Sequence, residues 1–385
     1  MRKEILITGA SGFIGSAFAA ANIKDCNICH IVVRKGGIDK YEKAIRRAFI
    51  GLFEEDLYDK YKSNIRYIML PKNENELLLF IDETNKVQEV WHFAARMTYD
   101  IKSVSKSLED NTKQTVLLYD LCNQMKSMKH FYFISTAYVN GLQESITETI
   151  DFPNVNFLNS YQISKFFTET SLSKRYYENK TDDGKRVALD KHSLNIVRPT
   201  IIIGSSKTGW YGDKNYGFYS FLKVFNKLAS NGLRYFPKVF FCKNKLNTLP
   251  VDLFIENLRL LQEFNNTESL NVINIFGESM NLDLYYSFLE DVYKIKPIDM
   301  QNKFIKKIIS KQMGDNSLFT NLNKYEEENF KKITEQNVIK NREEDIKKAI
   351  ETYKSQNQND AGEKILSMIM KTLNLIFYIS CKIKK

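Results

Sequence analysis

The sequence predicts an α/β fold, with helices on both faces of a doubly wound parallel sheet and a smaller, mostly helical C-terminal lobe. Three observations support this prediction. Short apolar runs alternate with helical stretches over roughly the first 200 residues. A glycine-rich turn separates the first apolar run from the first helix, and from about residue 300 the composition shifts to Lys, Glu, Asn and Ile at helical spacing. Strands that alternate with helices form parallel sheets, because each crossover helix covers a face.

Composition excludes several other classes of protein. The 385 residues are 43% hydrophobic and 26% charged, so disorder and collagen-like structure are not expected. Five cysteines are an odd number in a chain with a large core, and we interpret them as reduced thiols. The N-terminus lacks a signal-peptide pattern, and no apolar run is long enough to span a membrane. We therefore expect a cytoplasmic protein.

The first turn carries a dinucleotide-binding pattern. The strand Ile5–Ile7 leads into three glycines spaced three residues apart, and a helix follows directly. This arrangement permits a tight turn and lets the backbone approach a pyrophosphate at the helix N-terminus, as in Rossmann folds. The predicted cofactor-binding residues of this turn are Thr8, Gly9, Ser11, Gly12, Phe13, Ile14 and Gly15.

The end of the second strand predicts the choice of cofactor. His30–Val33 is followed by Arg34 and Lys35, with no acidic residue to bind a ribose 2′-hydroxyl. Arginine pairs with a 2′-phosphate, so we expect NADPH rather than NADH. Arg46 and Arg47 on the next helix are further candidates for this phosphate, with a solvated helix face as the alternative. The segment 26–30 matches a haem-attachment pattern, but haem attachment needs export and no export signal is present.

A second group of residues carries acid–base chemistry. The strand Phe131–Ile134 ends in Ser135 and Thr136, and a later helix contains Tyr161 and Lys165 on one face, four residues apart. A phenol is a poor acid–base catalyst at neutral pH unless a nearby cation stabilises its phenolate. We expect Lys165 to lower the pKa of Tyr161, Tyr161 to donate a proton, and Thr136 to bind a substrate carbonyl.

The order of these motifs resembles that of the extended short-chain dehydrogenases/reductases over roughly residues 4 to 275. The resemblance implies that Tyr161 and Lys165 also contact the cofactor. It further implies that Thr136 supplies the catalytic hydroxyl group of the family, with Ser135 as the alternative for this role. Two features depart from the pattern: no aspartate follows the strand near Ile68, and Gln114 replaces a glycine. Further implied cofactor contacts are Ala94, Ala95, Asn111, Pro199, Thr200 and Ile201.

Two later segments resemble one branch of that superfamily, the thioester and fatty acyl-CoA reductases of the male-sterility-type NAD(P)-binding family. These segments are 198–210, which runs from Arg-Pro-Thr through an isoleucine run to Gly-Ser-Ser-Lys-Thr-Gly-Trp, and Pro250-Val251-Asp252. The resemblance implies NADPH-dependent reduction of an acyl thioester to an aldehyde, or onward to the alcohol. The chain contains no recognisable carrier domain, so the donor is expected to be acyl-CoA or a separate acyl carrier protein.

The aromatic-rich stretch 205–244 is where the family builds its substrate lobe. We expect the Rossmann domain to comprise residues 1–204 plus about 245–275, and the lobe to comprise 205–244 plus about 276–385. Most of these aromatics are expected to form the core of the lobe. The candidate substrate contacts are Ser135, Lys207, Trp210 and Tyr211.

The net charge of +10, and its distribution along the chain, limit the classes of binding partner that we expect. Residues 301–385 hold 17 Lys+Arg against 11 Asp+Glu, dispersed rather than interleaved with stacking aromatics, so no nucleic acid is expected. The residue pattern of segment 365–385 predicts a helix with a wide apolar face. It either docks on this protein or a second subunit, making a homo-oligomer, or lies in a membrane surface.

Two other functions stay open at this point. A nucleotide-sugar epimerase or dehydratase would retain its cofactor without net consumption, and a non-catalytic NADP-binding scaffold would share the fold. The intact set of Thr136, Tyr161 and Lys165 argues against the scaffold.

Overall fold

The computed structural model describes residues 2–34, 37–141, 143, 145–150, 156–178, 192–212, 217–237, 245–263, 269–298 and 324–357. A seven-stranded parallel sheet forms the centre of the larger unit, in the order β11-β7-β5-β4-β1-β2-β3. The order reverses direction at β1, as a doubly wound sheet requires. The strands are β1 (Glu4–Thr8), β2 (Ile28–Val33), β3 (Ile65–Met69), β4 (Glu89–His92), β5 (His130–Ile134), β7 (Ser193–Pro199) and β11 (Leu270–Ile275).

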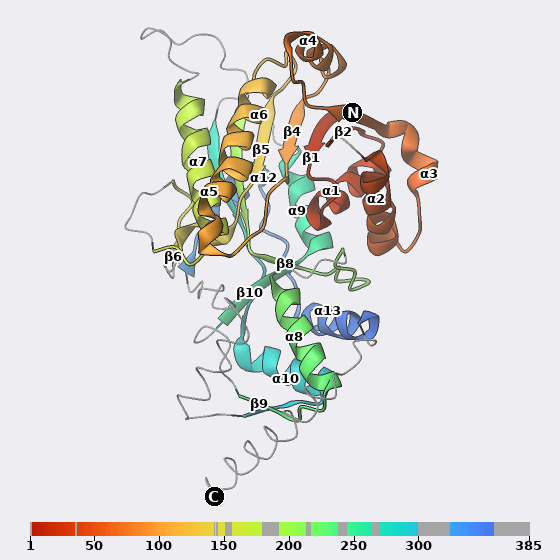
Figure 1. Cartoon of the computed structure of the whole chain (residues 1–385), viewed down its shortest axis with the longest axis vertical. Helices are drawn as coiled ribbons and strands as arrows, with labels where there is room; N and C mark the ends of the chain where they lie inside the picture. The colour runs from red at the N-terminus through yellow and green to blue at the C-terminus, as the bar shows by residue number, and fades with distance from the viewer. Residues whose placement is uncertain are drawn as a thin grey trace, which may run out of the picture.

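Helices cover both faces of this sheet (Figure 1). Side chains alternate along β1, so Ile5 and Ile7 face one layer while Leu6 faces the other. The first layer contains α1 (Phe13–Lys24), α2 (Ile38–Phe53), α3 (Tyr58–Tyr61), η1 (Lys62–Asn64), α9 (Val251–Leu261) and α12 (Glu328–Thr334). The second contains α4 (Glu74–Glu83), η2 (Ile101–Ser103), α5 (Val104–Ser107), the π-helical turn η3 (Leu108–Lys113), α6 (Gln114–Cys122) and α7 (Ser160–Glu178). The predicted fold class is confirmed.

A smaller lobe lies beyond the carboxyl ends of the strands (Figure 1). Its core is rich in aromatics, among them Tyr211, Phe218, Tyr219, Phe225 and Tyr285. Its helices are α8 (Phe218–Ser230), α10 (Leu282–Tyr293) and α13 (Glu343–Gln356). Its short strands are β8 (Ile201–Ile203), β9 (Tyr235–Pro237), β10 (Lys245–Pro250), β12 (Ser279–Asn281) and β13 (Lys296–Ile298).

The chain crosses between the two units more often than the predicted boundaries allow. β11 joins the main sheet as expected, but β10 belongs to a separate three-stranded sheet with β8 and β12. Phe330 of α12 and the nearby Val338 are buried in the core of the larger unit. β14 (Lys324–Tyr325) pairs with β6 (Ser145–Ile146), and η4 (Ala137–Asn140) precedes that strand. We predicted that all residues after 276 belong to the lobe, but the segment around Phe330 and Val338 packs on the sheet, because these two apolar side chains are buried there.

No helix among the described residues is long and apolar enough to cross a membrane. The segment 365–385, for which we weighed a membrane surface against docking, lies outside the described residues.

Candidate active site

The glycine turn between β1 and α1 is packed against the loop that follows β4. Gly9 has a positive φ of 77°, and a Cβ there would lie 2.6 Å from the amide nitrogen of Ala94. A Cβ on Gly15 would collide with the carbonyl oxygen of Gly9. The Gly12 amide donates to the Gly9 carbonyl at 2.9 Å, which closes the turn at the N-terminus of α1. The backbone therefore has the tight cradle that a pyrophosphate needs.

A buried polar chain runs behind this turn. The Thr8 hydroxyl is 2.8 Å from Nδ1 of His92, and Nε2 of His92 is 2.8 Å from the Thr115 hydroxyl. Thr115 in turn donates to the Asn111 carbonyl. Burial, and next the charge of Lys165, lower the pKa of His92 to about 3, so its imidazole is neutral. This chain fixes the ends of β1 and β4 side by side.

Asn111 holds the Ala94–Arg96 loop against α7. Its side-chain oxygen Oδ1 accepts from the backbone amide of Arg96 at 2.7 Å. Its side-chain nitrogen Nδ2 donates to the backbone carbonyl of Arg96 at 3.0 Å and to the Ser164 hydroxyl at 2.9 Å. Asn111 lies in the π-helical turn η3, a distortion that is often found at functional sites. The loop beside the glycine turn and the helix that carries Tyr161 are thereby joined.

Tyr161 and Lys165 lie on the same side of α7, facing the carboxyl end of β5. The Lys165 ammonium donates to the Ile134 carbonyl at 2.6 Å and lies 5.8 Å from the Tyr161 ring centre. The Tyr161 ring meets Tyr99 edge-on at 6.3 Å. Burial lowers the pKa of Lys165 to about 7, and Glu169 opposes this shift.

The pKa of Tyr161 is governed by its burial in this structure. Burial, with a smaller contribution from Tyr99, raises the pKa of Tyr161 above its ordinary value. The Lys165 ammonium is bound by the Ile134 carbonyl. Tyr161 is therefore a protonated phenol at neutral pH, and so has a proton to donate.

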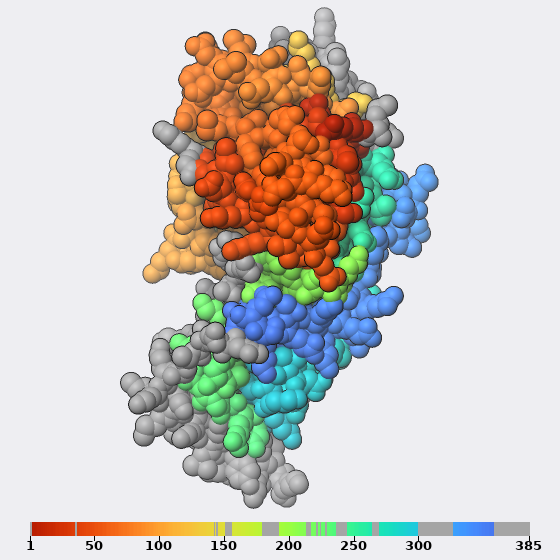
Figure 2. Space-filling view, turned by 90° about the vertical axis from the view of Figure 1, so that its right-hand side faces the viewer, coloured from red at the N-terminus to blue at the C-terminus, as the bar shows by residue number. Residues whose placement is uncertain are grey.

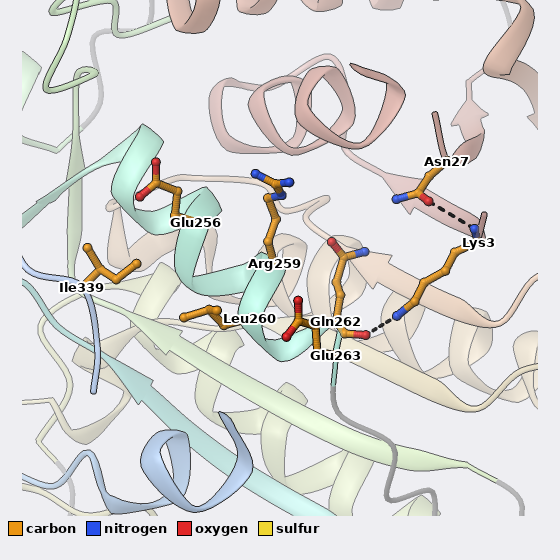
Figure 3. Close-up of a pocket in the computed structure, with 8 residues that line it drawn as sticks. All are labelled: Lys3, Asn27, Glu256, Arg259, Leu260, Gln262, Glu263 and Ile339. Carbon is orange, nitrogen blue, oxygen red and sulfur yellow. Dashed lines mark hydrogen bonds between the residues drawn. The ribbon is translucent and has the colours of Figure 1, made fainter. Parts of the chain in front are cut away.

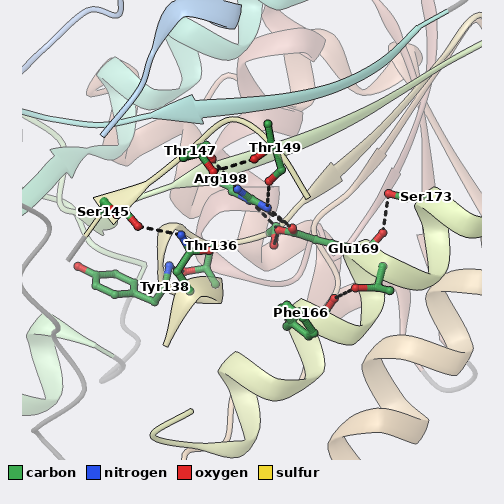
Figure 4. Close-up of polar contacts among 12 residues, drawn as sticks. Thr136, Tyr138, Ser145, Thr147, Thr149, Phe166, Glu169, Ser173 and Arg198 are labelled. Atoms are coloured by element: carbon green, nitrogen blue, oxygen red, sulfur yellow. Dashed lines mark hydrogen bonds and ion pairs between the residues drawn. The ribbon is translucent and has the colours of Figure 1, made fainter. Parts of the chain in front are cut away.

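Thr136 and Ser135 follow β5 but have different partners. Thr136 is buried, and its hydroxyl oxygen accepts from the Tyr138 amide at 3.3 Å, so the hydroxyl keeps a hydrogen to donate. The Ser135 hydroxyl donates to the carboxylate of Glu169. This carboxylate also binds Arg198 of β7, and Figure 4 draws the surrounding polar contacts. The partner of Ser135 argues against its use as the fallback carbonyl-binding residue.

Three of the remaining predicted cofactor residues lie between β7 and β8, and Ile14 lies on α1. Pro199 ends β7, and Ile201 begins β8. Between them, Thr200 is buried and donates through its hydroxyl to the Asn247 carbonyl at 2.7 Å. Ile14 lies in the first turn of α1.

A cavity of about 460 Å³ opens between the glycine turn and α2. Lys40, Lys43 and Arg47 line one side of it at helical spacing, with Asp39 at the helix start. The cavity is further lined by Ser11, Gly12, Phe13, Ser16, Gly37, Ala44, Trp210 and Gly212. Arg34, which follows β2, is exposed, and its amide donates to the Tyr41 hydroxyl at 3.2 Å.

Arg46, the other predicted phosphate-binding arginine of this helix, is not among the residues that line the cavity. Its guanidinium binds three carboxylates, those of Glu42, Asp56 and Asp59, at 2.8 to 3.0 Å. It also stacks over Tyr58, away from the cavity lining. The stripe of Lys40, Lys43 and Arg47 faces the cavity instead. We missed the two lysines, although the successive spacings of three and four residues from Lys40 to Lys43 and from Lys43 to Arg47 were the available signal.

The three substrate candidates after residue 204 belong to a segment that ties the lobe to α2. Gly51 of α2 leaves room for the Trp210 ring, which meets Phe13 edge-on at 5.2 Å. Tyr211 is buried and stacks on Tyr219 at 4.5 Å, so it belongs to the core of the lobe. Lys348 of α13 donates to the Lys207 carbonyl. Figure 2 shows this green segment between α2 and α13. These contacts are structural and argue against the predicted substrate roles.

A second cavity, of about 430 Å³, lies at the opposite end of the sheet (Figure 3). Lys3, Asn27, Arg259 and Gln262 are among its lining residues. Lys3 bonds to the buried carboxylate of Glu89 at 2.6 Å, which stabilises the amino ends of β1 and β4. Because ligands of open α/β sheets bind at the carboxyl ends, we do not assign this cavity to the active site.

The two cysteines of the haem-like pattern have different environments. Cys26 is exposed, whereas Cys29 is buried, and burial raises the pKa of its thiol. Among the described residues, no group of three or more His, Cys, Asp or Glu residues is arranged to hold a metal ion.

The fold and the glycine turn are those of a dinucleotide-binding α/β protein of the extended short-chain dehydrogenase/reductase type. Residues 7–258 match the family described as male sterility protein. The chain belongs to this family, which confirms the resemblance drawn from the sequence.

Among curated proteins, the chain is 25% identical over 167 residues to fatty acyl-CoA reductase 1 of Rattus norvegicus. That match covers 40% of this chain and 32% of the relative. It is 30% identical over 242 residues to dTDP-D-glucose 4,6-dehydratase of Dictyostelium discoideum, covering 60% of this chain and 49% of the relative. The chain thus spans between a third and a half of the length of these relatives.

Solved structures give the same fold. A thiolation-reductase di-domain from an archaeal non-ribosomal peptide synthetase superposes with a TM-score of 0.69 at 18% identity, covering 93% of this chain and 76% of that one. The terminal R domain of the myxalamid PKS-NRPS pathway has a TM-score of 0.69 at 15% identity, covering 94% and 93%. UDP-glucuronic acid 4-epimerase from Bacillus cereus has a TM-score of 0.60 at 17% identity, covering 94% and 99%.

Proposed function

We propose that the protein is an NADPH-dependent reductase that converts an acyl thioester to an aldehyde. The observation that carries this proposal is the convergence of Thr136, Tyr161 and Lys165 at the carboxyl end of β5, in a chain of the male sterility protein family. The matches to fatty acyl-CoA reductases and to a thiolation-reductase di-domain favour a thioester substrate. Acyl-CoA and a separate acyl carrier protein are the proposed donors.

The chain's own groups fit a dinucleotide. The turn at Gly9, Gly12 and Gly15 leaves room for a pyrophosphate where a Cβ would collide with the backbone. Bound NADPH would supply the hydride, while Asn111 and Lys165 secure the nicotinamide side of the cleft. The cavity beside α2, with Lys40, Lys43 and Arg47, suits the 2′-phosphate and supports NADPH over NADH.

Thr136, Tyr161 and Lys165 have separate roles in the proposed reaction. Thr136 donates its hydroxyl hydrogen to the thioester carbonyl oxygen and orients the carbonyl carbon for hydride addition. Tyr161 protonates that oxygen as the carbon becomes tetrahedral, and the Lys165 ammonium stabilises the resulting phenolate. Collapse of the hemithioacetal breaks the carbon–sulfur bond and releases aldehyde and thiol. One NADPH and one proton are consumed per aldehyde.

The decisive assay follows NADPH oxidation with a panel of acyl-CoA and carrier-bound thioesters while the aldehyde is trapped. We expect thioester-dependent oxidation in the wild type and its loss in Tyr161→Phe. Tyr177→Phe on the exposed side of the same helix is the matched control and should keep full activity. Oxidation that Tyr161→Phe leaves undiminished would contradict the mechanism.

A nucleotide-sugar epimerase or dehydratase is the second candidate, because the 30% identical dehydratase match covers 60% of this chain. Such an enzyme would interconvert a nucleotide sugar without net cofactor consumption. Sugar turnover with no thioester-dependent NADPH oxidation would favour it. Absence of both activities, with cofactor binding retained, would favour a non-catalytic scaffold.

The proposed location is the cytoplasm, with membrane contact through residues 365–385 as a further proposal. Deleting 364–385 should release the protein from lipid vesicles. Unchanged partitioning would contradict membrane contact, and a change in oligomeric state after the deletion would instead favour docking on a second subunit.

A further inference from the structure

A fully buried ion pair lies directly behind the proposed catalytic residues. Glu169 of α7 accepts from Arg198 of β7 at 2.5 Å, and the two side chains are 2% and 3% exposed. Arg198 also donates to the carbonyl oxygens of Thr147 at 2.9 Å and Thr149 at 3.1 Å (Figure 4). Buried charges are costly unless their hydrogen bonds are satisfied, and here both partners are bound from several sides. The pair therefore holds α7, β7 and the segment after β6 in one arrangement.

Glu169 also reaches the strand end that presents Thr136. Its carboxylate accepts from the Ser135 hydroxyl, and Lys165, one turn earlier on α7, donates to the Ile134 carbonyl. Two successive turns of one helix thus bind two successive residues of the chain immediately before Thr136. Because Tyr161 lies on the same helix, these contacts set the separation between Tyr161 and Thr136.

Several groups face Lys165 from the elements packed around it. His92 of β4 is neutral, Phe133 of β5 presents its ring 4.5 Å from the ammonium, and Tyr161 is a neutral phenol. Glu169 favours the charged form of Lys165, while burial opposes it. Arg198 of β7 pairs with Glu169 and compensates part of its charge.

We propose that Glu169, held by Arg198, is a positioning residue that keeps Lys165 charged and fixes Thr136 opposite Tyr161. This inference rests on the proposed function for its catalytic consequence. Its effect on the protonation of Lys165 does not depend on any substrate. The two parts can therefore be tested separately.

The experiment compares Glu169→Gln and Glu169→Asp with the wild type, and Glu178→Gln on the exposed end of α7 as control. The pKa of Lys165 is read from its ¹³Cε shift in protein labelled with ¹³C-lysine, assigned through Lys165→Met. The pH profile of kcat for thioester reduction is measured in parallel. Thermal melting and NADPH affinity report on folding.

For Glu169→Gln we expect the pKa of Lys165 to fall by about one unit, because a favourable negative charge is lost. The alkaline limb of kcat should move to lower pH by the same amount. Glu169→Asp should keep the pKa close to that of the wild type but lower kcat by about 10²-fold, because the shorter side chain cannot reach Ser135 and Arg198 together. Glu178→Gln should change neither quantity.

An unchanged pKa of Lys165 in Glu169→Gln would overturn the inference. If Glu169→Gln does not fold, the kcat of Glu169→Asp tests the positioning role. A kcat equal to that of the wild type in Glu169→Asp would overturn it. A wild type without thioester reduction, but with the expected shift of the Lys165 pKa, would defeat the proposed function and leave the charge contact standing.

Discussion

Replacing Lys165 by methionine should make the protein more stable and also inactive. The Lys165 side chain is buried, and burial lowers its pKa from the ordinary 10.5 to about 7. The unfolded chain therefore binds a proton between pH 7 and 10.5 that the folded protein does not bind. Stability contributed by this site consequently rises with pH through that window, by about 1.4 kcal/mol per unit.

The magnitude follows from these two pKa values. Below pH 7 the buried ammonium costs about 5 kcal/mol, and the penalty fades as the pH approaches 10.5. Methionine removes it but leaves the Ile134 carbonyl without its Lys165 partner, at a cost of about 1–3 kcal/mol that does not vary with pH. Between pH 6 and pH 9, the advantage of Lys165→Met over the wild type should therefore shrink by about 3 kcal/mol.

Urea unfolding of cofactor-free protein at pH 6, 7, 8 and 9 measures this difference. Titrating groups that do not interact with Lys165 cancel between the two proteins, and the pKa of His92, at about 3, lies below this pH range. Lys174→Met is the matched control, because Lys174 lies on the same helix with its side chain 75% exposed. That control should stay within about 0.5 kcal/mol of the wild type at every pH. An advantage of Lys165→Met that is constant from pH 6 to pH 9 would refute the lowered pKa.

Three further predictions concern the cofactor site. Arg47→Ala should weaken NADPH binding by about tenfold and NADH binding little, as measured by fluorescence titration. Arg46→Ala is the control and should leave both affinities unchanged. Equal losses of NADPH affinity in the two variants would place the 2′-phosphate elsewhere. Gly9→Ala should abolish cofactor binding and lower the melting temperature, because its Cβ would meet the Ala94 amide at 2.6 Å, and normal affinity in this variant would contradict the packed turn. In a Trp91→Phe background, Trp210 is the one tryptophan left. NADPH should quench the emission of Trp210, because Trp210 lines the cavity. Unchanged emission at saturating NADPH would exclude contact between NADPH and Trp210.

The parallel sheet, the glycine turn and the Tyr161–Lys165 pair could be predicted from the sequence, because they depend on local spacing. Strand and helix periodicity, and a turn that only glycine fits, are properties of neighbouring residues. Local spacing could not distinguish the two arginines of α2. Arg46 and Arg47 are adjacent and chemically equal in the sequence, and only packing turns Arg46 toward Asp56 and Asp59 and Arg47 toward the cavity.

Tertiary structure alone decided the protonation of the site and the course of the chain after residue 276. The pKa values of Lys165 and Tyr161 depend on burial by segments far away in the sequence, which no spacing rule records. The contact of Glu169 with Ser135 and Arg198 joins residues 29 to 34 positions apart. Likewise, Phe330 returns to the sheet because its apolar side chain is buried there, although its neighbours in the sequence are charged.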